Sequence, residues 1–137
     1  MNRLSLVMVA LFSVSAIQDR PMVNRMDGVY ELVSSRNGNQ NWIAPKWKGM
    51  MIVKEGRYSR VYQEKVAVSE ITYHSNAGSY LYTGKQIKMN VRYSNYRPLV
   101  GVSFENQVVW SLDRKLLTLS SKEKGNNFEE IWKRVEK

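Results

Sequence analysis

The chain contains no cysteine, and this absence limits how a small protein can be stabilised. It excludes disulfides, zinc sites built on cysteine and a lipid-modified N-terminal cysteine. Stability must therefore come from a hydrophobic core, which a single domain of 137 residues is long enough to form. The hydrophobic content of 43% is ordinary for such a domain.

Residues that carry chemistry are also scarce. The chain has one histidine, His74, which we expect at the surface near the end of a short helix, without a catalytic role. Glu64, Glu70 and Glu105 lack the spacing of metal ligands, and Glu129–Glu130 should point to opposite faces of a strand. No nucleophile elbow, phosphate loop or dinucleotide fingerprint is present. The sequence therefore predicts no catalytic residue, no metal site and no cofactor.

Only one long apolar run occurs, and it lies at the N-terminus. Arg3 precedes the run Leu4–Val14, and Val14-Ser15-Ala16 fits a small-residue cleavage site. The run is shorter than the roughly 20 residues that cross a bilayer, so residues 1–16 are expected to be a secretory signal peptide. We expect a secreted or periplasmic protein, cleaved near Ala16, with a loose arm at 17–26 and no membrane-spanning segment.

Basic residues outnumber acidic ones, 21 to 12, which gives a net charge of +9 and favours anionic partners. The basic residues are scattered, with no block of five or more. No recognition-helix pattern is present, so no nucleic-acid partner is expected. Association with an anionic lipid or polysaccharide surface remains one alternative.

The remaining chain, 27–137, alternates short strand patterns with turn signals, which is typical of an all-β barrel. We expect its first strand, Gly28–Ser34, to pair with its last, Phe128–Val135, because a meander barrel must close its edges. A short helix is expected at Val66–Ser75, between Ser69-Glu70 and Asn76-Ala77-Gly78. The other expected strands are Met50–Val53, Arg57–Gln63, Ser79–Thr83, Gln86–Ser94, Val102–Leu112 and Leu116–Ser120.

Two features leave alternatives open. Around the Glu55-Gly56 turn, Arg60 shares one strand face with apolar and aromatic residues, but neither face of this hairpin is clearly polar. If the Arg60 face is the lumen, it would suit the carboxylate of an amphipathic ligand. Trp42 and Trp47, on either side of Pro45, form either a lid across the barrel mouth or an outer layer.

In this order the motifs resemble the bacterial lipocalin-like domain family, within the calycin group. The resemblance covers about 28–134 and implies an eight-stranded antiparallel up-and-down barrel with one short helix. The motifs that carry it are Gly28-Val29-Tyr30-Glu31-Leu32-Val33-Ser34, Gly49, Glu55-Gly56-Arg57-Tyr58, Gly78-Ser79-Tyr80, Pro98 with Gly101, Trp110, Leu117-Thr118-Leu119 and Trp132-Lys133-Arg134.

Two positions depart from the family pattern. Tyr30 stands where the family usually has Trp, and Val108 stands where an Arg is common. The resemblance implies barrel closure by Gly28, Tyr30, Trp132 and Arg134, with Arg134 stacked on Tyr30 in a cation–π contact worth roughly 0.5–2 kcal/mol.

The resemblance also implies a binding protein for a small hydrophobic or amphipathic molecule. An enzyme of isomerase or cyclase type is the alternative. The ligand-binding residues expected inside the barrel are Arg60, Tyr58, Tyr62, Met51, Tyr80, Met89 and Trp110.

Overall fold

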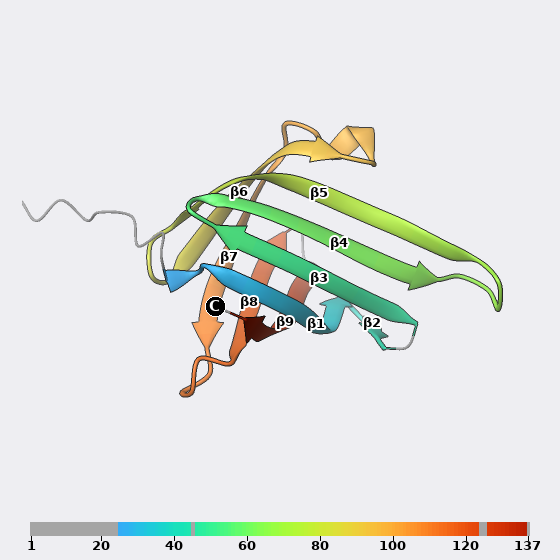
Figure 1. The fold of residues 1–137 in the computed structure, drawn as a ribbon, viewed down its shortest axis with the longest axis horizontal. Coiled ribbons are helices and arrows are strands. Elements are labelled where there is room, and N and C mark those ends of the chain that lie inside the picture. Colours follow the sequence, from blue (N-terminus) through green and yellow to red (C-terminus); the bar gives the residue numbers. More distant parts are fainter. Residues whose placement is uncertain (1–24, 45, 124–125, 137) are drawn as a thin grey trace, which may run out of the picture.

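A computed structural model of the chain describes residues 25–44, 46–123 and 126–136. The expected signal peptide and most of the expected arm, like Pro45, lie outside these residues. The described chain forms a closed, eight-stranded, antiparallel up-and-down barrel with one additional short strand, β2 (Figure 1). Its elements are β1 (Gly28–Asn37), β2 (Gln40–Ile43), β3 (Trp47–Lys54), β4 (Arg57–Lys65), β5 (Ile71–Tyr82), β6 (Gln86–Ser94), η2 (Arg97–Leu99), β7 (Ser103–Trp110), β8 (Leu116–Glu123) and β9 (Asn126–Glu136).

The first and last barrel strands close the sheet, as the sequence predicts. β1 pairs with β9 in antiparallel register, from Tyr30 opposite Arg134 to Asn37 opposite Phe128. The two strands lie side by side in Figure 1 although they come from opposite ends of the described chain. On its other edge, β1 pairs with β3 near its start and with β2 near its end. β1 therefore has no free edge along most of its length.

The β3–β4 hairpin shows which of its faces is the lumen. Glu55 and Gly56 connect the strands with positive φ angles of 49° and 78°, as a two-residue hairpin turn requires. The face that carries Arg60 is buried, whereas Met50 and Ile52 on the other face are exposed. The cation therefore points into the barrel.

The prediction of a helix at Val66–Ser75 is wrong. Residues 66–70 form a tight loop, in which Val66 N–H donates to the Glu70 carbonyl, and β5 begins at Ile71. β5 pairs with β4 over nine residue pairs, so sheet hydrogen bonding overrides the local helix start and stop signals. The short helical element is instead the 3₁₀ turn η2, which contains Pro98.

A bulge between β5 and β6 changes the direction in which Tyr93 points. The alternation of β6 predicts Tyr93 on the buried face, but Tyr93 is 73% exposed. Ala77 lies opposite Tyr93 while Gly78 lies opposite Val91, so the register shifts by one residue and turns Tyr93 outward.

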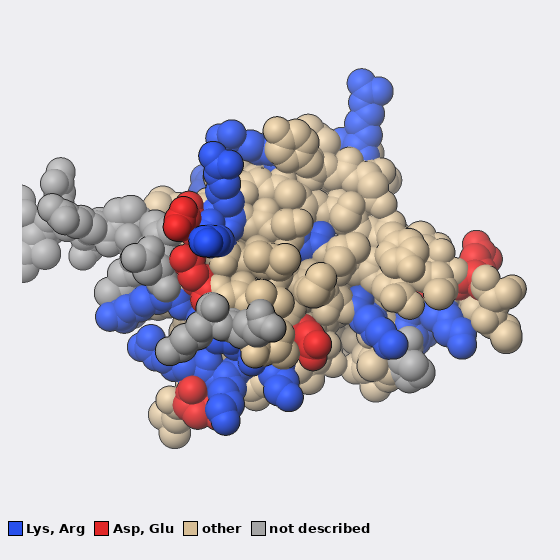
Figure 2. Space-filling view, in the orientation of Figure 1, with Lys and Arg blue, Asp and Glu red and all other residues tan. Residues whose placement is uncertain are grey.

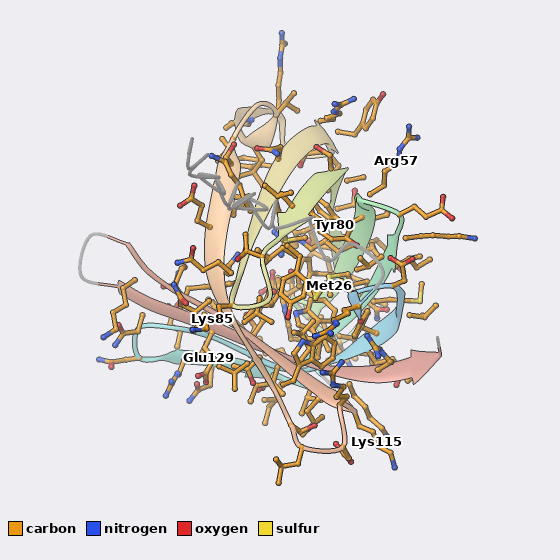
Figure 3. The ribbon with its side chains drawn as sticks, turned by 90° about the vertical axis from the view of Figure 1, so that its left-hand side faces the viewer. Met26, Arg57, Tyr80, Lys85, Lys115 and Glu129 are labelled. Carbon is orange, nitrogen blue, oxygen red and sulfur yellow. The ribbon has the colours of Figure 1, made fainter. Side chains whose placement is uncertain are left out.

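One end of the barrel is plugged by an aromatic cluster around Tyr30. The Tyr30 hydroxyl donates to the Met26 carbonyl at 2.6 Å, and the Arg134 guanidinium lies 5.3 Å from the Tyr30 ring centre and 4.7 Å from that of Trp110. The predicted stacking of Arg134 on Tyr30 is confirmed. Met26, assigned to a loose arm by its sequence, is fully buried in this plug, and Figure 3 shows it among the interior side chains.

Apolar side chains continue from the plug into the adjoining part of the barrel and fill it. The buried cluster comprises Met26, Tyr30, Met51, Val53, Tyr58, Tyr62, Tyr80, Tyr82, Ile87, Met89, Val108, Leu117, Leu119 and Trp132. Most of these side chains lie on the parts of their strands nearest the plug. The other half of the barrel is open.

Candidate functional site

The open half of the barrel holds a cavity of about 640 Å³. Two segments border its mouth: the β2–β3 region, with Trp42 and Trp47, and the β6–β7 connection, with Tyr96 and Leu99. Both tryptophans thus face the cavity and do not form an outer layer, although they are part of its lining and not a lid across it. Phe104 and Phe128 add further aromatic surface. The walls thus offer flat apolar surfaces for a ligand.

The polar floor of the cavity centres on Arg60. This side chain is only 8% exposed, and its guanidinium carbon lies 5.7–5.8 Å from the ring centres of Tyr58, Tyr62 and Phe104. Its Nε donates to Asn76 Oδ1 at 2.9 Å. Burial opposes the positive charge, but the neighbouring Tyr62 and Glu130 outweigh that effect and raise the pKa of Arg60. Arg60 is therefore a charged group at neutral pH.

Glu130 is the counter-ion of Arg60 and is only 2% exposed. Its carboxylate accepts hydrogen bonds from the Tyr62 hydroxyl at 2.6 Å and the Trp132 indole at 3.1 Å, and Arg60 Nη1 lies 3.5 Å away. Burial raises the pKa of Tyr62 well above the usual value for tyrosine, so its hydroxyl stays a donor. Glu130 is thus held in place chiefly by Tyr62 and Trp132.

Several floor groups have hydrogen-bonding capacity that the described residues leave unused. Arg60 Nη2 and Asn76 Nδ2 make no hydrogen bond within 25–44, 46–123 and 126–136. The buried side chains of Ser35 and Asn106 likewise make none there, and both line the cavity. None of these atoms belongs to the fully buried side-chain atoms without a partner, which in the described chain are Trp47 Nε1 and Tyr58 Oη. They are thus accessible from the cavity, and this floor is suited to a ligand that brings its own polar atoms.

At the rim, aromatic rings stack beside an acid–base pair. The Trp47 ring lies 5.8 Å from Tyr62 and 5.7 Å from His74. His74 Nε2 is 3.4 Å from Glu64 Oε2. The sequence placed His74 at a helix end, but β5 places it opposite Tyr62, at the cavity mouth. This position gives a carboxylate and an imidazole access to whatever the cavity holds.

The structure brings together only some of the ligand-binding residues expected from the sequence. Arg60 and Tyr62 line the cavity, and Tyr58 packs against Arg60. Three others, Met51, Tyr80 and Met89, lie in the packed core. Trp110 lies at the plugged end, where its indole donates to the Tyr82 hydroxyl at 3.3 Å.

Sequence reasoning missed Glu130, although a signal was available. Strand alternation that places Phe128 and Trp132 in the lumen also places Glu130 there. Its burial next to Arg60 could not be read from the sequence, because it depends on β4 facing β9 across the barrel. Asn76 and Asn106 gave no comparable signal: Asn76 was assigned to a helix end.

The face of the molecule over β3–β5 is not continuously basic (Figure 2). Figure 2 shows Lys and Arg mostly toward the edges of the face over β3–β5, with acidic side chains among them and uncharged residues at its centre. This face therefore gives no support for docking on an anionic surface.

Comparison with known proteins assigns the chain to no family. No protein-family model matches the chain, and no curated protein is significantly similar to it. Within the described residues, none of the helical segments has the length and apolar character needed to cross a membrane.

Proposed function

We propose that this protein is an exported, lipocalin-like binding protein that holds a small amphipathic molecule in the open half of its barrel. The polar head group lies on the floor against Arg60, and the apolar part lies between the aromatic side chains at the mouth. The observation that supports this most is the buried Arg60, which faces a cavity with part of its donor capacity unused.

The cavity also favours an anionic or acceptor-bearing head group. Glu130 accepts from Tyr62 and Trp132, so Arg60 is not needed to satisfy it alone. The donors of Arg60 and Asn76 that face the cavity can both bind one oxygen-bearing group. Hydrogen bonds that involve a charged group are stronger than those between neutral groups. The motif order from Gly28 to Arg134 and the segment 1–16 support the lipocalin-like and exported parts of the proposal.

Tryptophan fluorescence provides the test, because Trp42 and Trp47 line the cavity. Naphthoate and dodecanoate should quench it saturably, and the matching alcohols should bind more weakly. Arg60→Gln should weaken carboxylate binding by roughly 10- to 150-fold, the equivalent of 1.5–3 kcal/mol for a charge-assisted hydrogen bond. The carboxylate affinity of Arg60→Lys should lie between those of the unmodified protein and Arg60→Gln, since lysine keeps the charge but not the planar guanidinium.

Arg57→Gln is the matched control, because Arg57 is exposed on the same strand and points away from the barrel in Figure 3. Its affinity for carboxylates should equal that of the unmodified protein. If Arg60→Gln and Arg57→Gln bind alike, Arg60 does not hold the head group. If no amphipathic carboxylate binds below about millimolar, the binding function itself is excluded.

A second candidate function is catalysis on the bound molecule. It is favoured by one contact, His74 Nε2 to Glu64 Oε2 at the cavity rim, which resembles a base with an orienting carboxylate. A turnover that His74→Gln abolishes while ligand affinity is unchanged would support it. Turnover that persists in His74→Gln would exclude this pair as its source.

A further inference from the structure

The barrel wall is incomplete between β7 and β8. These strands pair only from Gln107 opposite Ser120 to Trp110 opposite Leu117. Both continue toward the mouth, β7 through Ser103–Asn106 and β8 through Ser121–Glu123, without pairing to each other. Figure 3 shows the two strands diverging near Lys85. We call this opening the notch.

An outer groove of about 670 Å³ meets the cavity at the notch. Both spaces are lined by Glu105, Asn106, Ser121 and Phe128. Asn106 lies on the same face of β7 as the buried Val108, and Ser121 on the same face of β8 as the buried Leu119. Inward-facing residues thus form part of the floor of an outside groove, so the cavity and the groove adjoin each other where β7 and β8 are unpaired.

The groove differs from the cavity in its chemistry. Its charged side chains are mostly compensated: Arg36 pairs with Glu129 at 3.2 Å, and Glu105 pairs with Lys88 at 3.1 Å. What remains is chiefly amides and hydroxyls, which both donate and accept hydrogen bonds. These groups are Gln86, Asn106, Gln107, Ser120, Ser121 and Asn127.

From this arrangement we infer that the ligand is longer than the cavity and carries an uncharged, hydrogen-bonding segment, such as a sugar or an amide chain, that leaves through the notch and lies in the outer groove. The inference rests on the proposed function and extends it. The head group binds Arg60, the apolar middle lies between the aromatic walls, and the uncharged segment binds the amide and hydroxyl side chains outside.

The natural absence of cysteine allows a clean test by stapling. Glu105→Cys with Lys122→Cys places two thiols across the notch. Each position lies two residues beyond the last pair, Gln107 opposite Ser120, and on the same face of its strand. A short bis-methanethiosulfonate linker then closes the notch reversibly. The probes are hydroxynaphthoate and its maltoside, and binding is followed by tryptophan quenching. Relative to the same double variant with its two thiols free, the linked form should bind the maltoside at least about tenfold more weakly. Linking should not change the affinity of that variant for hydroxynaphthoate, and reduction should restore maltoside binding.

The control staple joins Val109→Cys to Thr118→Cys, which already face each other in the paired part of the wall. It should leave both probes unaffected. If the notch staple changes neither probe, the notch is not a path for the ligand, although the cavity still binds. If neither probe binds the unmodified protein, the proposed function fails and this inference fails with it.

Discussion

Tyr58 and Tyr62 are neighbouring tyrosines on the inner face of β4, and they differ in what their hydroxyls contact. The Tyr62 hydroxyl donates to Glu130 at 2.6 Å. The Tyr58 hydroxyl is buried and has no hydrogen-bond partner in the described part of the chain. A buried polar group without a partner reduces stability, whereas one in a charge-assisted hydrogen bond contributes to it.

Replacing each hydroxyl should therefore have opposite effects on stability. Tyr58→Phe should leave the free energy of unfolding unchanged or raise it by about 1 kcal/mol, because it removes an unsatisfied group. Tyr62→Phe should lower it by about 1.5–3 kcal/mol, because Glu130 loses its shortest hydrogen bond. Urea unfolding at neutral pH measures both. Equal effects of the two substitutions would contradict the assigned environments.

At the scale of elements, the β5–β6 bulge depends on Gly78. A Cβ on Gly78 would lie 1.8 Å from the Asn90 carbonyl oxygen, far inside contact distance. The two backbones approach this closely where the register shifts between Ala77 and Gly78. The glycine that looked like a helix stop in the sequence is thus required by strand packing.

Gly78→Ala should destabilise the barrel by about 3 kcal/mol or more, since the clash is with backbone and cannot be relieved by a side-chain rotation. Ser79→Ala, at the next position in the same strand, is the control and should cost less than about 1 kcal/mol. Thermal unfolding of both variants tests this. A Gly78→Ala protein as stable as Ser79→Ala would mean that the strands do not approach as described.

At the scale of the whole molecule, the interior is unusually rich in buried tyrosines. Burial raises the pKa of Tyr30, Tyr58, Tyr62 and Tyr80 above the usual value for tyrosine. In the unfolded chain these groups ionise near pH 10. Above about pH 10 the unfolded state therefore releases protons that the folded state keeps, and this difference favours unfolding.

The contribution of these tyrosines should thus be fully present below about pH 10 and decrease as the pH rises further. Urea midpoints measured from about pH 8 to pH 11 should fall at the alkaline end, and tyrosinate absorbance should appear together with unfolding. In Tyr58→Phe the fall should be smaller, because one raised pKa is removed. A midpoint that stays constant to about pH 11 would contradict the buried positions of these hydroxyls.

The sequence by itself predicted the order of the eight barrel strands, most of the turns and the closure of the barrel, but neither β2 nor the first part of β5. These follow from local rules: alternation in Gln86–Met89, the Glu55-Gly56 turn, and the need to pair the edges of Gly28–Ser34 and Phe128–Val135. The cation–π contact between Arg134 and Tyr30 was also predicted, through the resemblance to the lipocalin-like family.

Only the tertiary structure decided what the barrel contains. The alternation of the β3–β4 hairpin did not decide whether Arg60 points into the barrel or out of it. The closed sheet decides this, because it brings β4 across from β9 and Arg60 beside Glu130. Pairing with the preceding strand, β4, turned the expected helix into β5, since nine residue pairs outweigh a short helix that is marginal on its own. The notch arises where β7 and β8 stop pairing, a property of two chain segments together that neither segment carries alone.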